Sequence, residues 1–330
     1  MNSASLSPFK KTDLVSPYIQ IPENIQSFDF DTYHIDEEYV LKNIAGHLFQ
    51  TMLHVSPFDI NTQTLSVFIS LVAQKYNANP FHNFQHAVNV LHTTHFLLLN
   101  TNILHKISPV VTFGLLIASL CHDIDHPGHT NAYEIQTFSK YAKLYNDNSV
   151  LENHHCTTTF EVLEQSGLLQ EIMDKNYFVE FRKTIICSIL GTDMAKHTKF
   201  MKQLSEFDTS KPTFTLEEQY ILCKLLLHSA DLSSSSKPFD VSMEWSKRIL
   251  FELHYQDNEY MSPQKTEIDM LTISSNEINF ITNITLPLWE LFISKFDNMH
   301  FIIQRCKQNL QSWRELHHAI TADNLGKIDY

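Results

Sequence analysis

Residues 109–126 read PVVTFGLLIASLCHDIDH. The leading proline and the uncharged, mostly apolar run that follows it predict a buried helix over residues 110–120. This helix continues directly into His122-Asp123, with Asp125 and His126 close behind. Burying imidazole and carboxylate groups costs free energy unless something compensates them, and a bound cation is the usual compensation. The stretch therefore predicts a helical core with potential metal ligands at the end of one helix.

The composition supports the same fold class. The chain has 330 residues, 43% of them hydrophobic and 18% charged, which is enough for one large globular domain or two small ones. Only 6 residues are glycine, whereas Leu, Ile, Phe and Lys are abundant, so strands joined by tight turns are disfavoured. We predict an all-α fold in which residues 1–35 are a linker or N-terminal tether and residues 36–330 form the helical domain.

Apolar residues recur at the helical period along most of the chain. They predict further helices from residue 36, through the 60s and 70s, from about 81 to 100, from about 151, from 216 to 231 and from 278 to about 318. Thr215 and Glu218 form a capping-box pattern that starts the helix at 216. Residues 233–236 are expected to form a polar break and residues 257–276 a mobile loop. Pro287 should kink the last helical region.

Histidine, aspartate and glutamate residues gather in four groups between residues 82 and 231. The groups are H-N-F-Q-H (82–86), H-D-I-D-H (122–126), E-N-H-H (152–155) and H-S-A-D (228–231). His82 and His86 are four residues apart, so on one helix they would share a face and reach a common site. Such pairs often only cap or pack helices, and a lone carboxylate such as Asp231 is often a helix-end residue. Each group alone is weak evidence for a metal site, and the four together are strong evidence.

The donor types indicate which cations would bind. Imidazole with carboxylate suits zinc, and carboxylate with water suits magnesium or manganese. One carboxylate that bridges two cations would make a two-metal centre, which activates water and binds a phosphoryl group for in-line attack. We therefore expect a metal-dependent hydrolase. The alternative is a structural cluster of buried His–Asp hydrogen bonds.

The charge of the chain restricts its partners. The formal net charge is −13 and there is no basic run, which disfavours binding to a nucleic-acid backbone. No apolar run reaches the ~18 residues of a membrane span, and the first residues lack the apolar core of a signal peptide. The five cysteines include no C-x-x-C pair, as is usual for reduced thiols. We expect an intracellular, cytoplasmic protein, with membrane attachment through upstream segments left open.

Taken in order, these segments resemble the catalytic domain of class I 3′,5′-cyclic nucleotide phosphodiesterases, and residues 121–155 look most like the cGMP-selective branch. The resemblance extends over about residues 36–313. Its motifs are F-H-N-F-Q-H-A (81–87), C-H-D-I-D-H-P-G (121–128), Y-N-D-N-S-V-L-E-N-H-H (145–155), G-T-D-M-A-K-H (191–197), H-S-A-D-L-S (228–233) and P-L-W-E (287–290). It implies a compact bundle of about sixteen helices in three subdomains, with a binuclear metal site at their junction.

The family pattern also implies a role for each matching residue. The zinc ligands would be His86, His122, Asp123 and Asp231. Asp123 would also bridge to a second ion, commonly Mg²⁺ with Mn²⁺ as the alternative. The residues that hold the waters of that second ion would be His126, Glu152, His155 and Thr192.

The implied reaction is the hydrolysis of a 3′,5′-cyclic nucleotide to the 5′-monophosphate. A metal-bridging hydroxide would attack phosphorus. His82 would be the general acid that protonates the departing O3′, because an imidazole near solvent titrates close to neutral pH.

The same resemblance places the base of the nucleotide in an apolar slot. Its walls would be Phe280 on one face and Ile249 with Leu253 on the other, flanked by Met194. Glu277 stands where the family has a purine-reading glutamine, and Ser234 replaces a common asparagine near the base. An ionised glutamate only accepts hydrogen bonds, which suits the adjacent N–H donors of guanine, whereas a protonated one would also suit adenine. Glu277 therefore favours cGMP and leaves cAMP possible.

Two other functions stay open at this point. A general HD-type metal phosphohydrolase acting on linear nucleotides would keep His122-Asp123 and Asp231 but would need neither Phe280 nor an acid at His82. A degenerate domain would bind a cyclic nucleotide without turnover, and only Glu277 favours it. The sequence leaves open regulatory domains upstream and the oligomeric state.

Overall fold

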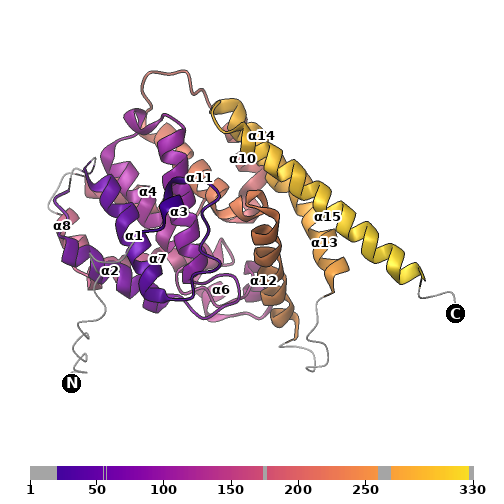
Figure 1. Cartoon of the computed structure of the whole chain (residues 1–330). Coiled ribbons are helices and arrows are strands. Elements are labelled where there is room, and N and C mark those ends of the chain that lie inside the picture. Colours follow the sequence, from indigo (N-terminus) through magenta and orange to yellow (C-terminus); the bar gives the residue numbers. More distant parts are fainter. Residues whose placement is uncertain (1–20, 55, 57, 174–176, 259–268, 327–330) are drawn as a thin grey trace.

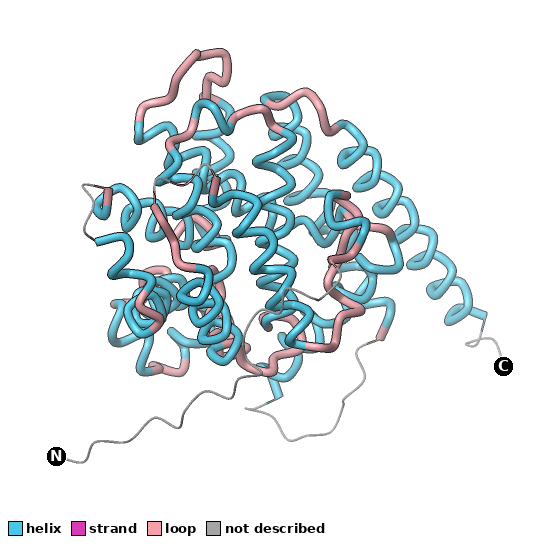
Figure 2. The backbone as a smooth tube through the Cα atoms, turned by 60° about the vertical axis from the view of Figure 1, so that its left-hand side comes forward, coloured by secondary structure: helices cyan, strands magenta, loops and turns pink. Residues whose placement is uncertain are grey.

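The computed structural model describes residues 21–54, 56, 58–173, 177–258 and 269–326. Every regular element in these ranges is helical, which confirms the predicted all-α fold. Figure 2 shows helices joined by loops, without a strand in the part of the chain that is described. Within the same ranges, no helix combines the length and the apolarity that crossing a membrane requires.

The α-helices follow one another from α1 to α15, and several are labelled in Figure 1. Their bounds are α1 Glu38–Leu53, α2 Thr62–Lys75, α3 Phe84–Asn100, α4 Pro109–Cys121, α5 Asn131–Gln136, α6 Lys140–Tyr145, α7 Val150–Gln165, α8 Leu168–Met173, α9 Phe178–Ile189, α10 His197–Ser205, α11 Leu216–Asp231, α12 Phe239–Asn258, α13 Met270–Phe280, α14 Leu286–Lys295 and α15 His300–Gly326. Short 3₁₀ helices are η2 Glu23–Gln26, η3 Leu104–Lys106, η4 Met194–Lys196 and η5 Leu232–Ser236, and η6 Ile281–Thr285 is a π-helical turn.

Side-chain caps determine where the helices that carry the His/Asp groups begin. Asn83 accepts a hydrogen bond from the amide of His86 and so starts α3. Ser108 caps α4, whose first residue is a proline that needs no amide partner there. Thr215 and Glu218 form the predicted capping box at the start of α11, which is thereby confirmed. Each cap satisfies amides that the first helical turn leaves without a partner.

Helix α4 is the centre of the fold. Every residue from Val110 to Cys121 is buried, so the helix needs neighbours on all its faces. It packs against α3, α9 and α11, and Figure 1 labels α3 and α11 beside it. This packing brings the C-terminal ends of α4 and α11 to the N-terminal end of α3.

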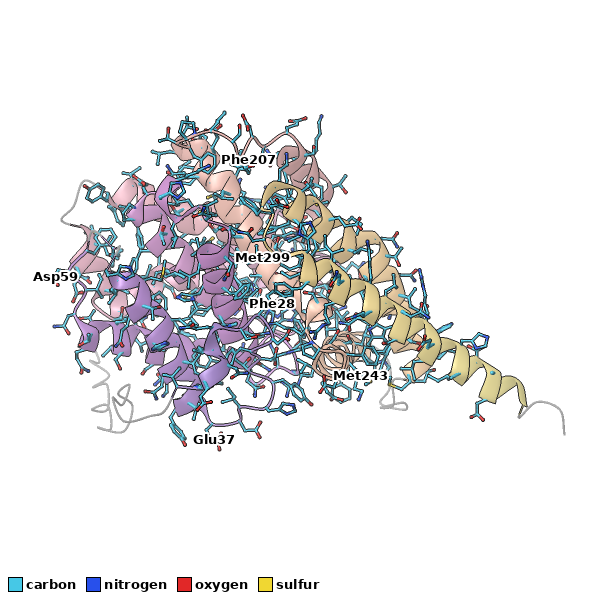
Figure 3. The ribbon with its side chains drawn as sticks, turned by 45° about the horizontal axis from the view of Figure 1, so that its top comes forward. Phe28, Glu37, Asp59, Phe207, Met243 and Met299 are labelled. Carbon is cyan, nitrogen blue, oxygen red and sulfur yellow. The ribbon has the colours of Figure 1, made fainter. Side chains whose placement is uncertain are left out.

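The segment before α1 packs onto the helical body. Figure 3 shows Phe28 between the N-terminal helices and the C-terminal pair α14–α15, and its ring contacts those of Trp289 and Phe301. The buried Lys237 donates hydrogen bonds to the carbonyls of residues 28 and 30. The division at residue 36 stays a prediction, and residues 1–20 lie outside the described ranges. Residues 21–35 nevertheless contribute to the core.

Two polar segments differ from their sequence-based prediction. The serines of residues 233–236 form the 3₁₀ helix η5, three of them buried, because their hydroxyls bond to nearby carbonyls and to Thr93. Residues 257–276 were expected to form one loop, but α12 continues to Asn258 and α13 begins at Met270, capped by Asp269. Residues 259–268 lie outside the described residues.

The C-terminal region is broken where the proline predicts a kink. Pro287 lies in the first turn of α14, and the π-helical turn η6 precedes it. A proline lacks the amide that would continue the regular hydrogen-bonding pattern, so the chain changes register there. Beyond α14, helix α15 packs against α13 and α14 and extends past the body of the molecule, as the yellow ribbon in Figure 1 shows.

Candidate metal centre and active site

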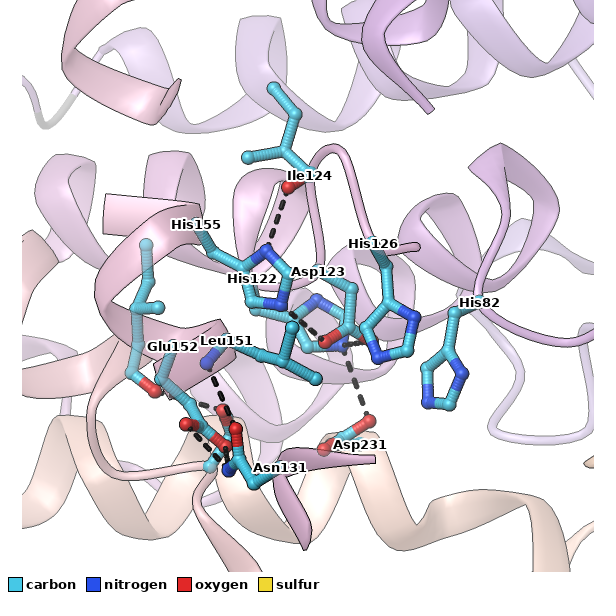
Figure 4. Close-up of polar contacts among 12 residues, drawn as sticks. His82, His122, Asp123, Ile124, His126, Asn131, Leu151, Glu152, His155 and Asp231 are labelled. Atoms are coloured by element: carbon cyan, nitrogen blue, oxygen red, sulfur yellow. Dashed lines mark hydrogen bonds and ion pairs between the residues drawn. The ribbon is translucent and has the colours of Figure 1, made fainter. Parts of the chain in front are cut away.

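Four potential ligand atoms converge at the ends of three helices. His86 lies in the first turn of α3, His122 caps the end of α4 with Asp123 next to it, and Asp231 is the last residue of α11. His86 Nε2 is 3.1 Å from Asp231 Oδ1, and His122 Nε2 is 3.0 Å from Asp123 Oδ2. One ligand atom from each residue lies within 4.8 Å of the other three. Figure 4 shows His122, Asp123 and Asp231 facing one another.

The donor set of this cluster fits a divalent cation. His122 Nδ1–H donates to the carbonyl of Ser119 at 3.0 Å, which fixes the ring so that Nε2 points into the cluster. His86 Nε2 and His122 Nε2 face each other at 3.2 Å beside two carboxylates. The cluster thus holds close together two ring nitrogens of buried histidines and two carboxylate oxygens of half-buried aspartates, which are the ligand types that zinc takes.

The pKa values of the cluster residues are shifted by burial and by the charges of their neighbours. Burial disfavours a charged His122, but Asp123 and Asp231 outweigh burial and hold its pKa well above the ordinary value. Burial likewise disfavours ionised carboxylates, but His122 holds the pKa of Asp123 and of Asp231 below the usual range. The two aspartates are therefore anionic, and a bound cation would compensate them in place of the proton on His122.

A pocket of about 400 Å³ opens over the cluster and carries only negative formal charge apart from its histidines. The carboxylates in its wall are Asp123, Glu152, Asp193, Asp231 and Glu252. No lysine or arginine is among the described residues of that wall. Such a wall repels an anionic ligand unless bound cations neutralise it.

His82 lies outside α3, so the prediction that it shares a helical face with His86 is wrong. Asn83 has an extended backbone (φ −131°, ψ −179°) and caps the helix, which leaves His82 in the preceding turn. Its ring still reaches the pocket and stacks on that of His126, with centroids 3.9 Å apart. Figure 4 shows these two rings side by side.

Glu252 of α12 holds His82 in this position. Its carboxylate accepts hydrogen bonds from His82 Nδ1 and from the backbone amides of Phe81 and His82, the latter two at 2.9 and 3.0 Å. Burial raises the pKa of Glu252, but these bonds outweigh burial and lower it below its usual value. Burial disfavours a protonated His82, but Asp123 and Glu252 outweigh it and raise its pKa.

The sequence analysis did not predict a role for Glu252. It is the only acid within the otherwise apolar run of residues 249–253, and 170 residues separate it from His82. No spacing rule connects two residues that far apart. The one available signal was a charged side chain in an apolar helical stretch, which is more often a solvated position.

Two further histidines near Asp123 are neutral. Burial lowers the pKa of His155 to about 4, and its Nδ1–H donates to the carbonyl of Ile124 at 2.7 Å. His155 Nε2 is thus an acceptor, 3.8 Å from Asp123 Oδ1. Burial also holds the pKa of His126 well below its usual value, and its Nδ1 accepts from the amide of Gly128 at 3.0 Å. The free proton of His126 is therefore on Nε2.

Glu152 and Thr192 lie in the wall of the same pocket. Asn131 donates to both carboxylate oxygens of Glu152, at 3.1 and 3.0 Å. Burial raises the pKa of Glu152 to about 7. Thr192 Oγ1 donates to the carbonyl of Ile189 at 2.8 Å, which leaves its lone pairs free to accept. The structure thus brings all four predicted water-holding residues to one pocket, and it adds Asn131, which the sequence analysis did not name.

Comparison with known proteins identifies the family. Residues 81–306 match the family model of the 3′5′-cyclic nucleotide phosphodiesterases. The chain belongs to this family. This phosphodiesterase domain includes all the residues of the cluster and of the pocket described above.

The relatives of this phosphodiesterase domain include a cGMP-specific 3′,5′-cGMP phosphodiesterase 3 from Dictyostelium discoideum, 29% identical over 88% of this chain and 64% of that protein. The human high affinity cGMP-specific 3′,5′-cyclic phosphodiesterase 9A is 29% identical over 89% of this chain and 51% of that protein. The crystal structure of the phosphodiesterase domain of the RhoPDE fusion protein from Salpingoeca rosetta is 32% identical, with a TM-score of 0.83 over 90% of this chain and 97% of that chain. The chain thus spans less than two thirds of the length of these curated relatives.

Only part of the predicted base slot reaches the pocket of this phosphodiesterase domain. Met194 and Leu253 are in the wall. The residues that the described wall does not include are Ser234, Ile249, Glu277 and Phe280. Glu277 is buried in α13 beside Ser246 of α12, and burial raises its pKa to about 7. The chain between α12 and α13 includes residues 259–268, which the structure does not describe.

Proposed function

We propose that this chain hydrolyses 3′,5′-cyclic nucleotides to 5′-monophosphates and prefers cGMP. The observation that carries the proposal is the shared pocket of two groups: the His/Asp cluster and the His82–Glu252 pair. The first has the ligand types of a divalent metal site, and the second holds an imidazole as a proton donor. A hydrolase of phosphate diesters needs both, because it must stabilise negative charge and protonate a leaving oxygen.

The residues of the cluster would hold the metal ions. The zinc ligands would be His86, His122, Asp123 and Asp231. Asp123 would share a second ion, magnesium or manganese, and the waters of that ion would be held by His126, Glu152, His155 and Thr192. Bound divalent cations activate water and neutralise the charge of phosphoryl oxygens.

His82 would act as the general acid through one defined atom. Its Nδ1–H donates to Glu252, so the second proton of the imidazolium is on Nε2. As the bond between phosphorus and O3′ breaks, this proton passes from Nε2 to O3′, which leaves as a neutral hydroxyl. Glu252 stabilises the protonated ring before the transfer and keeps its orientation. Glu252 is thus a positioning residue.

The acidic wall of the pocket supports a requirement for metal ions, because the proposed substrate is itself an anion. Five carboxylates surround the place where a cyclic phosphate would bind, and no lysine or arginine in the described wall offsets them. The affinity for the phosphate must then come from bound cations.

The preference for cGMP rests on Glu277. An ionised carboxylate accepts two hydrogen bonds from the N1–H and N2–H₂ donors of guanine, whereas adenine presents an acceptor at N1. Because burial raises the pKa of Glu277 to about 7, both of its forms are populated near neutral pH. The names of relatives from Dictyostelium and human agree with a cGMP preference. Of two Drosophila relatives at 32% identity, one is named as cGMP-specific and the other as a dual specificity enzyme.

The test is product analysis with cyclic and linear substrates. The purified chain with zinc and magnesium should convert cGMP to 5′-GMP faster than cAMP to 5′-AMP, in ¹⁸O-labelled water with one label per product phosphate. Hydrolysis of linear nucleotides with cGMP left intact would assign the chain to the HD-type phosphohydrolases. Saturable cGMP binding without product would identify a non-catalytic binding domain.

A further inference from the structure

A second cavity, of about 550 Å³, is walled by α9, α10 and α11. We call the pocket of about 400 Å³ over the His/Asp cluster the catalytic pocket. The two cavities share one segment: residues 190, 191 and 196 line the second cavity, whereas residues 192–195 line the catalytic pocket. The cations in the wall of the second cavity are Arg182, Lys183, Lys196, Lys199 and Lys224, and its described wall contains no carboxylate. We call this cavity the basic pocket. In a chain with a net charge of −13, five cations around one cavity are a strong local reversal of sign.

Two of the five cations have carboxylate partners outside the cavity. Lys183 pairs with Glu217 at 2.5 Å, and Lys196 lies 3.6 Å from Asp193. Among the described residues, the Arg182 guanidinium forms no ion pair and lies over the ring of Phe160, 5.0 Å from its centroid, and Lys199 and Lys224 form no ion pair either. These two ammonium groups are therefore available to an anion that enters the basic pocket.

The backbone at residue 191 allows Lys224 to reach the pocket. A Cβ atom at Gly191 would lie 2.8 Å from Lys224 Cγ, so the stem of the lysine crosses directly over the glycine. Lys224 is half-buried and its side chain contributes to the wall of the cavity. Any side chain at residue 191 would displace this stem.

Beneath the cations the basic pocket is apolar. Phe178, Ile186, Leu190 and Phe200 contribute to its wall, and Phe200 is buried. Apolar surface next to unpaired cations matches a ligand that carries both kinds of group. A bare inorganic anion would leave the apolar wall in contact with water, and a neutral apolar molecule would leave the two lysines without a partner.

We propose that the basic pocket binds a small amphipathic anion. Its apolar or aromatic body would pack on the wall formed by α9 and α10, and one acidic group would pair with Lys199 and Lys224. The volume lies within the ~300–1,000 Å³ of small-molecule sites. A protein partner would need roughly 800 Å² of surface on this chain, which a single cavity does not offer.

Fluorescence titration of the full chain tests the proposal. The probe is 8-anilinonaphthalene-1-sulfonate, an aromatic body with one sulfonate, and its uncharged counterpart is N-phenyl-1-naphthylamine. One equivalent of the sulfonate should bind saturably and more tightly than the neutral amine. Excess cGMP should not displace the sulfonate, either with metal ions present or after their chelation, since the catalytic pocket is a different cavity.

The variants assign the binding to the two lysines. Lys199→Met with Lys224→Met removes both charges and keeps the side-chain length, and it should weaken sulfonate binding about five- to tenfold, as expected for two partly exposed ion pairs. Binding of the neutral amine should stay unchanged. Lys202→Met is the matched control, because this exposed lysine also lies on α10 but outside the pocket wall. Ile186→Trp fills the cavity and should exclude both probes, with folding checked by thermal unfolding.

Three results would overturn the proposal. One is a wild-type chain that binds the sulfonate no more tightly than the neutral amine. Another is a loss of affinity in Lys202→Met as large as in the double variant, which would reduce the effect to general electrostatics. The third is a dimer in sedimentation that Ile186→Trp disperses, because the pocket would then belong to an interface between copies of the chain.

Discussion

The catalytic pocket and the basic pocket lie against the same short segment, residues 190–196, but they carry opposite charge. The catalytic pocket has five carboxylates and no lysine or arginine in its described wall, and the basic pocket has five cations and no carboxylate. Both are proposed to bind anions. The comparison teaches that an acidic pocket can serve a phosphate ligand only through bound cations, whereas the basic pocket needs none.

Removal of metal should separate the two pockets most sharply. Chelation with EDTA and 1,10-phenanthroline should lower cGMP hydrolysis by about 10³-fold or more, because several kcal/mol of charge stabilisation is lost. Binding of the naphthalene sulfonate should change by less than about twofold. Adding zinc and magnesium should restore turnover. Full activity after exhaustive chelation would contradict the proposed role of the cluster.

His82→Ala should lower kcat by about 10²–10⁴-fold while the metal content stays the same, because it removes a proton donor and no ligand. Turnover and bound metal are measured on the same preparation. His300→Ala, at an exposed position of α15, is the control and should behave as the wild type. Loss of metal together with activity would show that His82 is a ligand instead.

Glu252→Gln should have a smaller effect, about tenfold on kcat, because the ring of His82 stays in place but loses its anionic partner. Glu252 helps to raise the pKa of His82, so the variant lowers that pKa. Activity requires protonated His82 and falls as the pH rises through its pKa. The alkaline limb of the pH–rate profile should therefore move to lower pH, whereas Glu244→Gln on the same helix should leave it in place. An unmoved limb would leave Glu252 only a structural role.

Glu277→Gln should change substrate choice more than rate. The preference for cGMP over cAMP in kcat/KM should fall about fivefold, because a neutral amide replaces a charged acceptor. In the wild type, this preference should rise with pH through about 7 as Glu277 ionises, since burial raises its pKa to that value. The variant should lack the pH dependence. A ratio that is identical in both proteins at every pH would refute the role of Glu277 in reading the base.

The four residues of the His/Asp cluster could be predicted from the family resemblance, and the structure shows why they meet: they stand at helix ends. Asn83, Ser108 and the Thr215–Glu218 box determine where α3, α4 and α11 begin, and the apolar run of α4 requires the other two to surround it. Motifs attached to these helices then come together. The same local rule corrected one detail, since the Asn83 cap places His82 before α3.

Contacts between distant segments could not be predicted in this way. Glu252 reaches His82 only because the fold brings α12 against the turn that precedes α3, and nothing in either segment specifies that contact. Lys199 and Lys224 each resemble an ordinary solvated lysine on its own helix. They form one charged cavity only after α9, α10 and α11 have packed. The burial of Phe28 and Phe30 likewise depends on partners more than 200 residues away, such as Lys237.

Anomalous diffraction at the zinc edge, on crystals grown with zinc and magnesium, tests the central claim most directly. We predict a zinc peak about 2.0–2.2 Å from His86 Nε2, His122 Nε2 and one oxygen each of Asp123 and Asp231. The peak should vanish in Asp231→Ala. A fully occupied zinc site elsewhere in the chain, with none at these four residues, would contradict the account.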